Sequence, residues 1–387
     1  MAKQLKEAVI VACGRSAIAR GGKGSLKDTH PVDFAAQVLK GTLDRVPGLD
    51  RALIDDLILG CAKPEGVQGS NVARQVVQRA GLPDSVAGQT VNRFCASGLQ
   101  SIASASYCIQ VGQAEVMLAG GLESMTAIPM GSPKEYQEPW NAEHTDVYMP
   151  MGLTAERVAE KYGVTRLEME QMAVESHAKA SAAQESGAFD WEIVPIKAKG
   201  ETGEPVDFKT DEGVRKGTNL EKLATLKPSF KEDGLVTAAT ASQVSDGTGF
   251  VVLMDADKAA SLGIKPLARF VGFSVAGVPA GIMGIGPVYA VPKVMAQTGL
   301  TVDDMDVIEI NEAFAAQAIP CIRELKLPTA KVNPRGGAIA LGHPLGATGA
   351  ILTCKAISYL RDNGGRYGLI TMCVGGGMGA AGIIEKL

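Results

Sequence analysis

Two cysteines in small-residue surroundings and one histidine in a turn are the side chains of this sequence best suited to chemistry. Cys95 lies in VNRFCASG, Cys373 in TMCVGGGMG and His343 in ALGHPLG. Glycine has no Cβ, so backbone N–H groups and a substrate can approach a neighbouring reactive side chain closely. Two thiols and an imidazole could supply a nucleophile and two proton-handling groups. That set suits acyl transfer to sulfur better than metal binding or a disulfide.

Cys95 follows an extended Val91-Asn92 pair and stands at the start of a helix predicted over Ser97–Val111. The partial positive charge and free N–H groups of a helix N-terminus favour the thiolate, so we expect the Cys95 pKa to lie below about 8.5. The same N–H groups could bind a developing oxyanion. Position alone supports a small buried hydrophobic cysteine about equally well.

His343 is bounded by glycine and proline and precedes a predicted helix, a setting that fits a general base or an oxyanion donor as well as a structural turn. Cys373 follows a predicted strand, Gly368–Met372, and precedes three glycines, so the Gly375 N–H could face the thiol. A dinucleotide-binding loop is the alternative there. It is disfavoured because no βαβ unit and no ribose-binding acid follow.

Asn311 lies where a predicted strand, Val307–Ile310, leads into a predicted helix, Glu312–Leu325. The simplest role for an asparagine at that point is the helix N-cap. A second role is to hold a water or a carbonyl oxygen in the site, and the two roles can coexist.

Composition indicates a globular protein of two or more domain-sized units, because the chain has 387 residues with 46% hydrophobic and 21% charged side chains. The net charge of −4 gives no reason to expect nucleic acid or an anionic membrane as partner. Seven cysteines, an odd number without a C-x-x-C pair, argue against a disulfide framework and a structural zinc site. The apolar run Ala8–Ala12 is too short for a secretory segment, and no stretch reaches transmembrane length. We therefore expect a cytoplasmic protein with no metal.

Strands alternate with helices along the chain, which predicts an α/β fold with a largely parallel sheet covered on both faces. A buried strand over Glu115–Ala119 is expected to end at Gly120-Gly121. Between residues 122 and 235 the composition changes, with two amphipathic helices and an exposed loop over Lys197–Asp207, which indicates an insertion packed over the core. From about residue 265 the order of signals repeats that of the first part, so we expect a site between two similar halves.

Four blocks of this sequence together resemble the thiolase family in their order and spacing, over essentially the full length. They are Val91–Gln100, Asn311–Phe314, Gly336–Gly349 and Met372–Gly379. The resemblance implies the thiolase fold, with two similar βαβαβαββ halves in a five-layered αβαβα arrangement and an inserted loop domain. It implies an N-terminal half over 1–121, completed by about 236–264, a loop domain over 122–235 and a C-terminal half over 265–387.

The resemblance also implies a role for each candidate residue. Cys95 would be the acyl-accepting nucleophile, His343 the group that activates it, and Cys373 the acid/base that protonates the leaving enolate and later activates coenzyme A. Asn311 would hold a water that stabilises the enolate oxygen together with the His343 ring. A second oxyanion hole would use the backbone N–H groups of Cys95 and Gly375. The residues expected to bind coenzyme A are Arg215, Phe230, Ser242 and Phe314.

The expected activity is thiolytic cleavage of 3-ketoacyl-CoA to acetyl-CoA and a shortened acyl-CoA in fatty-acid β-oxidation, with coenzyme A as a substrate and no covalently bound cofactor. Short-chain acetoacetyl-CoA thiolases usually carry Tyr-His-Met-Gly in the loop domain. The corresponding stretch here, Val147–Gly152, has no histidine. The alternatives are an acetoacetyl-CoA thiolase, a ketoacyl synthase-type condensing enzyme and a non-catalytic acyl-CoA or lipid-binding protein. A homodimer or homotetramer is expected, with other β-oxidation enzymes as candidate partners.

Overall fold

The computed structural model describes residues 5–131, 133–200 and 202–387. Its strands are β1 Ala8–Arg15, β2 Ala19–Arg20, β3 Asp56–Gly60, β4 Ala87–Val91, β5 Val116–Ser124, β6 Ile196–Lys199, β7 Pro205–Phe208, β8 Ser245–Asp255, β9 Ala268–Gly277, β10 Val307–Ile310, β11 Tyr367–Val374 and β12 Met378–Lys386. Its α-helices are α1 Pro31–Leu43, α2 Val72–Arg79, α3 Ser97–Gln110, α4 Pro139–His144, α5 Met151–Tyr162, α6 Arg166–Glu185, α7 Leu220–Ala224, α8 Ala256–Ser261, α9 Gly286–Thr298, α10 Ala315–Glu324, α11 Ala338–Leu341 and α12 Thr348–Asn363.

The main sheet contains the same strand arrangement twice. Its order is β10-β11-β12-β9-β1-β8-β5-β3-β4, with β2 paired to β8. In the first half β3 is parallel to β5, which is antiparallel to β8, and β8 is antiparallel to β1. In the second half β10, β11, β12 and β9 repeat those relations in the same order. The halves join where Val9 and Ile10 of β1 pair with Arg269 and Ala268 of β9.

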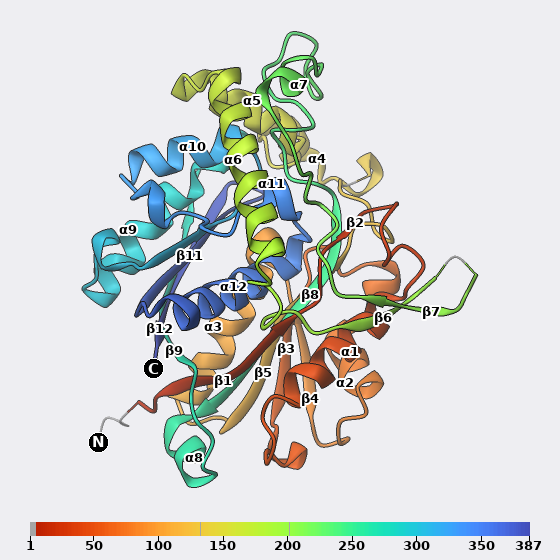
Figure 1. Ribbon diagram of the computed structural model, residues 1–387, viewed down its shortest axis with the longest axis vertical. Helices are drawn as coiled ribbons and strands as arrows, with labels where there is room; N and C mark the ends of the chain where they lie inside the picture. The colour runs from red at the N-terminus through yellow and green to blue at the C-terminus, as the bar shows by residue number, and fades with distance from the viewer. Residues whose placement is uncertain (1–4, 132, 201) are drawn as a thin grey trace.

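Five layers result, because α3 and α12 lie side by side between the two halves of the sheet (Figure 1). Strand β1 carries an unbroken apolar run, so both of its faces can pack against helices. Ala8 and Ile10 pack into the central cluster with α3 and α12, whereas Val9 and Val11 pack outwards against α1. Helices α9 and α10 cover the outer face of the second half.

The two central helices cross closely because glycines lie at their crossing. A Cβ on Gly349 would stand 2.2 Å from the backbone nitrogen of Leu99, and one on Gly98 would stand 2.8 Å from the backbone nitrogen of Ala350. Only a residue without a side chain fits at either position. Since α3 begins beside Cys95 and α12 begins beside His343, this crossing sets how the two residues face each other.

Three expectations about secondary structure are wrong. The main sheet is not largely parallel, because only the β3–β4, β3–β5 and β10–β11 pairs run parallel and its other strand pairs are antiparallel. Strand β5 does not end at Gly120-Gly121 but continues to Ser124, because both glycines pair with β8 through Phe250 and Gly249. Residues 197–207 are not simply an exposed loop either, since β6 and β7 form an antiparallel pair there. Their buried residues Ile196, Ala198 and Phe208 join the first-half core.

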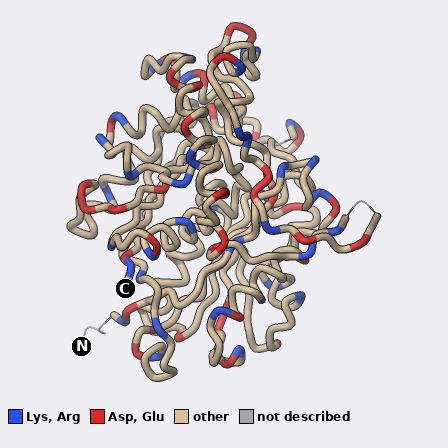
Figure 2. The backbone as a smooth tube through the Cα atoms, viewed as in Figure 1, with Lys and Arg blue, Asp and Glu red and all other residues tan. Residues whose placement is uncertain are grey.

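Basic and acidic residues are interspersed along the backbone of the described chain (Figure 2). Within the described part of the chain, no helix combines the length and the apolar composition needed to span a bilayer.

Candidate active site

Cys95 lies in a single 3₁₀ turn, Phe94–Ala96, that leads into α3, and 7% of its surface is exposed. Burial raises the pKa of its thiol to about 11, although the backbone N–H groups of Gly375 and of Cys95 itself lower it; the Glu123 carboxylate raises it further. The expectation of a lowered pKa is therefore wrong for the resting protein. The loss of hydration raises the Cys95 pKa more than the N–H groups at the start of α3 lower it. None of the groups named here is a cationic side chain that would stabilise the thiolate.

Cys373 lies near the end of β11 and is fully buried. Burial raises the pKa of its thiol well above the usual value, and the next contribution is the charge of Cys95. The two sulfurs therefore interact electrostatically. The N–H of Gly375, just beyond β11, acts on the Cys95 sulfur. Cys95 comes from the first half of the sheet and Cys373 from the second. The chain reversal after Cys373 provides the Gly375 N–H to the Cys95 sulfur.

The His343 ring is held at both nitrogens. Its Nδ1 lies 2.6 Å from Thr348 Oγ1, and its Nε2 lies 3.2 Å from Asn311 Nδ2. Thr348 Oγ1 donates to the Pro344 carbonyl at 3.2 Å, so it accepts a hydrogen bond from Nδ1–H, and the lone pair of Nε2 faces the Asn311 amide. Burial lowers the pKa of His343 to about 4, so the imidazole is neutral at pH 7.

Asn311 does not cap the following helix, because α10 begins at Ala315 with Phe314 as its N-cap. The segment between β10 and α10 is extended instead: Phe314 bridges to Ala241, and the Ala315 N–H donates to the Thr240 carbonyl at 2.8 Å. The Asn311 N–H donates to Thr371 of β11 at 2.9 Å, so Asn311 lies beside the strand that ends near Cys373. Its buried Oδ1 has no hydrogen-bond partner within the described residues, which leaves one acceptor for a water or a substrate group.

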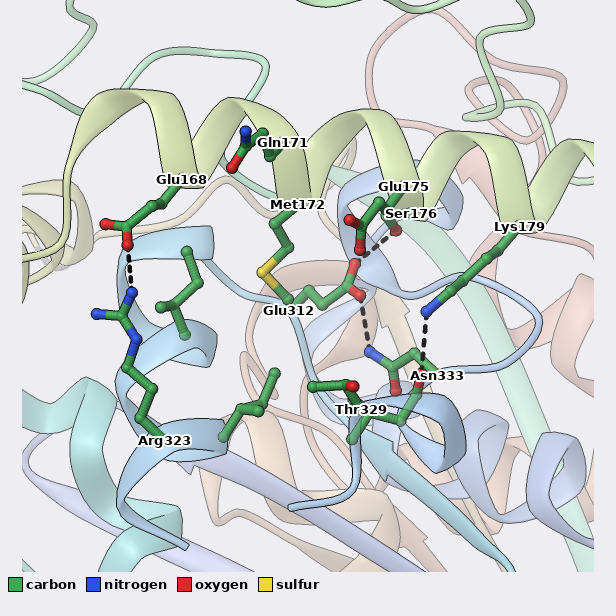
Figure 3. A pocket seen from close by; sticks show the side chains of 13 residues that line it. Glu168, Gln171, Met172, Glu175, Ser176, Lys179, Glu312, Arg323, Thr329 and Asn333 are labelled. Atoms are coloured by element: carbon green, nitrogen blue, oxygen red, sulfur yellow. Dashed lines mark hydrogen bonds and ion pairs between the residues drawn. The ribbon is translucent and has the colours of Figure 1, made fainter. Parts of the chain in front are cut away.

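The Glu312 carboxylate joins this extended segment to helices α6 and α11. Its carboxylate accepts from Ser176 Oγ of α6 at 2.7 Å, from Asn333 Nδ2 at 2.7 Å and from the Ile339 N–H of α11 at 3.2 Å (Figure 3). A cavity of about 410 Å³ lies beside it, between α6 and α10. The predicted catalytic residues are not among the described residues that line this cavity.

Three of the four residues expected to bind coenzyme A lie close together. The Phe230 and Phe314 rings meet edge to face with centroids 5.8 Å apart, and the Ser242 N–H donates to the Ala313 carbonyl at 2.9 Å. Arg215 is exposed, and its backbone N–H donates to His177 Nδ1 at 3.1 Å. The neighbouring Thr240 is fully buried, and its Oγ1 accepts from the Thr237 N–H at 3.0 Å.

Sequence reasoning missed several residues that support the site. Thr348 fixes the His343 ring, Ser245 Oγ accepts the His343 N–H at 3.2 Å, and Glu123 reaches the turn after His343. Thr348 and Glu312 lie within the motif blocks. A polar residue close to a candidate catalytic residue in the sequence could have indicated that it supports the site. The signal for Glu123 was an acid that directly follows the apolar run of β5 and still lies within the strand.

The duplicated α/β halves, with a cysteine from each half at the Gly375 turn and a histidine held by an asparagine, define a thiolase-like class of protein. The chain belongs to the thiolase family: the thiolase N-terminal domain model matches residues 8–257 and the C-terminal domain model matches residues 264–386.

Relatives of known structure and sequence agree with this. The chain is 48% identical to a 3-ketoacyl-CoA thiolase of Bacillus subtilis, over 98% of this chain and all of the relative. It is 42% identical to the human peroxisomal 3-ketoacyl-CoA thiolase, over 98% of this chain and 91% of that one. The structure matches an acetyl-CoA acetyltransferase of Bacillus anthracis with a TM-score of 0.92 at 42% identity, covering 99% of this chain and 100% of the other. The thiolase fold expected from the sequence is confirmed.

Proposed function

We propose that this protein is a 3-ketoacyl-CoA thiolase that cleaves 3-ketoacyl-CoA with coenzyme A to acetyl-CoA and a shortened acyl-CoA. The observation that carries the proposal is the convergence at Cys95. The Gly375 N–H acts on its sulfur, the charge of Cys95 raises the pKa of the buried Cys373 thiol, and a neutral His343 is held by Asn311 and Thr348. Full-length relatives with this activity in their names support it.

In the first half-reaction the Cys95 sulfur adds to the 3-keto carbon while His343 takes its proton. The bond between carbons 2 and 3 then breaks, and its electron pair leaves as the enolate of acetyl-CoA. Cys373 gives a proton to carbon 2 of that enolate, which releases acetyl-CoA and leaves a thioester on Cys95. A water held by Asn311 and the His343 ring stabilise the enolate oxygen, and the N–H groups of Cys95 and Gly375 stabilise the oxyanion on the acyl carbon.

In the second half-reaction the Cys373 thiolate takes the proton of coenzyme A, whose sulfur attacks the Cys95 thioester. The acyl group leaves as the shortened acyl-CoA, and His343 returns the proton to Cys95. Thiol acid/base groups suit this exchange because proton transfer works best between groups of similar pKa. Each group ends the cycle in the protonation state in which it began.

An acetoacetyl-CoA thiolase is the second candidate, favoured by the likeness to the Bacillus anthracis acetyl-CoA acetyltransferase. The loop stretch without histidine, Val147–Gly152, favours the degradative activity. We further propose a cytoplasmic homo-oligomer, with the inserted residues 122–235 over the shared site and Arg215, Phe230, Ser242 and Phe314 along the coenzyme A path.

The test is the rate of coenzyme A-dependent cleavage for 3-ketoacyl-CoA substrates of increasing chain length. We expect cleavage beyond the four-carbon substrate, an acyl adduct on Cys95 by intact mass, and neither in Cys95→Ala. Cleavage of acetoacetyl-CoA alone would assign the second candidate. Binding of acyl-CoA without any acylation of Cys95 would indicate a binding protein.

Cys373→Ser separates thiolase chemistry from that of a condensing enzyme on the same fold. Loss of the second thiol should lower kcat for thiolysis by roughly 100-fold or more, the usual contribution of a positioned acid/base. Full thiolysis by Cys373→Ser would show that this thiol does not move the protons.

A further inference from the structure

Glu123, at the end of β5, is a fully buried carboxylate that the mechanism above does not use. Its Oε2 accepts from the Ala62 N–H at 2.8 Å and the Gly346 N–H at 2.8 Å. Its Oε1 accepts from Gln68 Nε2 at 3.0 Å and, at longer distances, from the Lys63 N–H at 3.3 Å and the Cys61 thiol at 3.7 Å. Every one of these partners is a donor, so the ionised carboxylate is the form that fits.

One arm of this network reaches the histidine. Gly346 belongs to the 3₁₀ turn Leu345–Ala347, which lies between His343 and α12. This turn presses against β5, because a Cβ on Gly121 would stand 2.2 Å from the Gly346 carbonyl oxygen. The Glu123 carboxylate from the first half therefore holds the turn that carries His343 in the second half.

The other arm reaches the nucleophile. The Ala62 carbonyl accepts from Asn92 Nδ2 at 3.1 Å, and Asn92 Oδ1 accepts the Phe94 N–H at 2.8 Å, directly before Cys95. Phe94 has a φ of +43°, a conformation in which a bulky residue is strained and has to be held by its surroundings. The hydrogen-bonded chain thus runs from the turn of His343 through Glu123, Ala62 and Asn92 to the backbone of the nucleophile.

We propose that Glu123 is a positioning residue that fixes the His343 turn and the Cys95 turn relative to each other through these two hydrogen-bonded arms. The proposal rests on the proposed thiolase function for its kinetic consequence. An uncharged amide could not replace the carboxylate, because its NH₂ group would face either the Ala62 and Gly346 donors or those of Gln68 and Lys63.

The charge of Glu123 gives a readout that a merely structural residue would not move. Burial raises the pKa of Glu123 itself, and its negative charge is one of the causes that raise the pKa of the Cys95 thiol. The other titratable groups of this region are the Cys61 thiol, which contacts Glu123, the Cys373 thiol, whose pKa the Cys95 charge raises, and His343, which precedes the Gly346 turn. The Lys63 ammonium points away, towards the Gly131 carbonyl at 2.9 Å and Glu65.

Glu123→Gln removes the charge and half of the acceptors. We expect kcat for thiolysis to fall about tenfold or more while KM for coenzyme A stays within about twofold, because a small misplacement of reacting groups lowers the rate strongly. We expect the rate of Cys95 alkylation by iodoacetamide at pH 8 to rise about threefold, because loss of the charge lowers the thiol pKa.

Two further variants separate the effect of the Glu123 charge from that of its hydrogen bonds. Glu123→Asp keeps the charge but shortens the side chain, so kcat should fall while the pH profile of alkylation stays that of the wild type. Asn92→Ala cuts the nucleophile arm at an exposed residue and leaves Glu123 intact, so it should show the same pattern and carries the test if Glu123→Gln does not fold. Glu192→Gln is the matched control, a fully buried carboxylate bonded to Arg15, and should change neither kcat nor alkylation.

The proposal is overturned if Glu123→Asp or Asn92→Ala keeps the wild-type kcat, or if folded Glu123→Gln alkylates with the wild-type pH profile. A fall in both rates that only follows the folded fraction, measured by thermal melting, would also overturn it. The alkylation profiles need no acyl-CoA substrate. They therefore test the charge of Glu123 even if the wild-type protein fails to cleave 3-ketoacyl-CoA, an outcome that would remove the proposed function alone.

Discussion

At the scale of single residues, the site holds its two reactive groups uncharged. Burial raises the pKa of Cys95 to about 11 and lowers that of His343 to about 4, so both favour the neutral form at pH 7. A thiol and an imidazole in these states do not form a resting ion pair. In the proposed mechanism the thiolate therefore forms as the substrate binds, and the developing oxyanion meets the N–H groups of Cys95 and Gly375. This arrangement limits unwanted alkylation of the nucleophile between turnovers.

The buried imidazole predicts a pH dependence of stability. In the unfolded chain a histidine titrates near about 6.5, whereas folded His343 titrates at about 4. Between these values the unfolded state binds more protons, so the stabilisation is complete above about pH 6.5 and is lost as the pH falls towards 4. The difference amounts to about 3 kcal/mol.

Denaturant unfolding of the wild type and of His343→Gln at pH 7 and pH 4.5 measures this contribution. The loss of unfolding free energy on acidification should be smaller in the variant by about 2–3 kcal/mol. The control is His144→Gln, in the exposed helix α4. This variant should lose as much unfolding free energy between pH 7 and pH 4.5 as the wild type does. Equal losses in all three proteins would show that His343 titrates normally when folded.

At the scale of elements, the sequence predicted the long helices and buried strands because their apolar patterns are strong. Helices α5 and α6 are the two long amphipathic helices expected between residues 122 and 235, and β1 follows the apolar run that begins at Ala8. The errors fall where tertiary pairing decides. Strand β5 passes through Gly120-Gly121 because β8 supplies the partner, and α10 starts late because Phe314 pairs with Ala241 instead.

The sequence likewise predicted part of the candidate site: its motif residues, but not the hydrogen bonds around them. The motif blocks pointed to Cys95, His343, Cys373 and Asn311 as candidates, since their spacing along the chain is visible in the sequence. The hydrogen bonds of Glu123 were not predictable, because its donors Ala62 and Gly346 lie far from it along the chain and meet only when the halves fold together. The direction of the Cys95 pKa depended on burial, which no local pattern fixes.

The crossing of α3 and α12 predicts the effect of a single methyl group. In Gly349→Ala the new Cβ would meet backbone atoms of Leu99, nitrogen at 2.2 Å and Cα at 2.9 Å, so the helices have to separate. Overpacking of this kind costs about 1–3 kcal/mol. Because both helices begin beside reactive residues, kcat for thiolysis should fall about tenfold or more at full folding.

Gly277→Ala is the matched control, since nothing lies within 4 Å of a Cβ at that position. Thermal melting and thiolysis kinetics of the two variants check the prediction. If Gly349→Ala melts and turns over like Gly277→Ala, the close crossing does not set the geometry of the site.

At the scale of the whole molecule, one buried arginine joins the sheet to the segments that carry Glu192 and Asp211. Arg15 of β1 has no exposed surface; its Nε donates to Glu192 at 2.7 Å and its guanidinium makes two bonds to Asp211, at 2.8 and 3.0 Å. Asp211 also accepts the Ile18 N–H at 2.8 Å. The negative charges raise the pKa of Arg15 despite its burial.

Arg15→Met tests what this buried charge cluster contributes. The substitution keeps an apolar side chain of similar length but leaves the carboxylates of Glu192 and Asp211 buried without a cation. Removing one partner of a buried ion pair costs about 3–5 kcal/mol, whereas replacing all the charges together is often close to neutral. We therefore expect denaturant unfolding at pH 7 to show a large loss for Arg15→Met and recovery of at least half of it in Arg15→Met/Glu192→Gln/Asp211→Asn. If the triple variant were as unstable as the single one, packing and hydrogen-bond geometry of the arginine, rather than its charge, would hold the segments of Glu192 and Asp211 to the sheet.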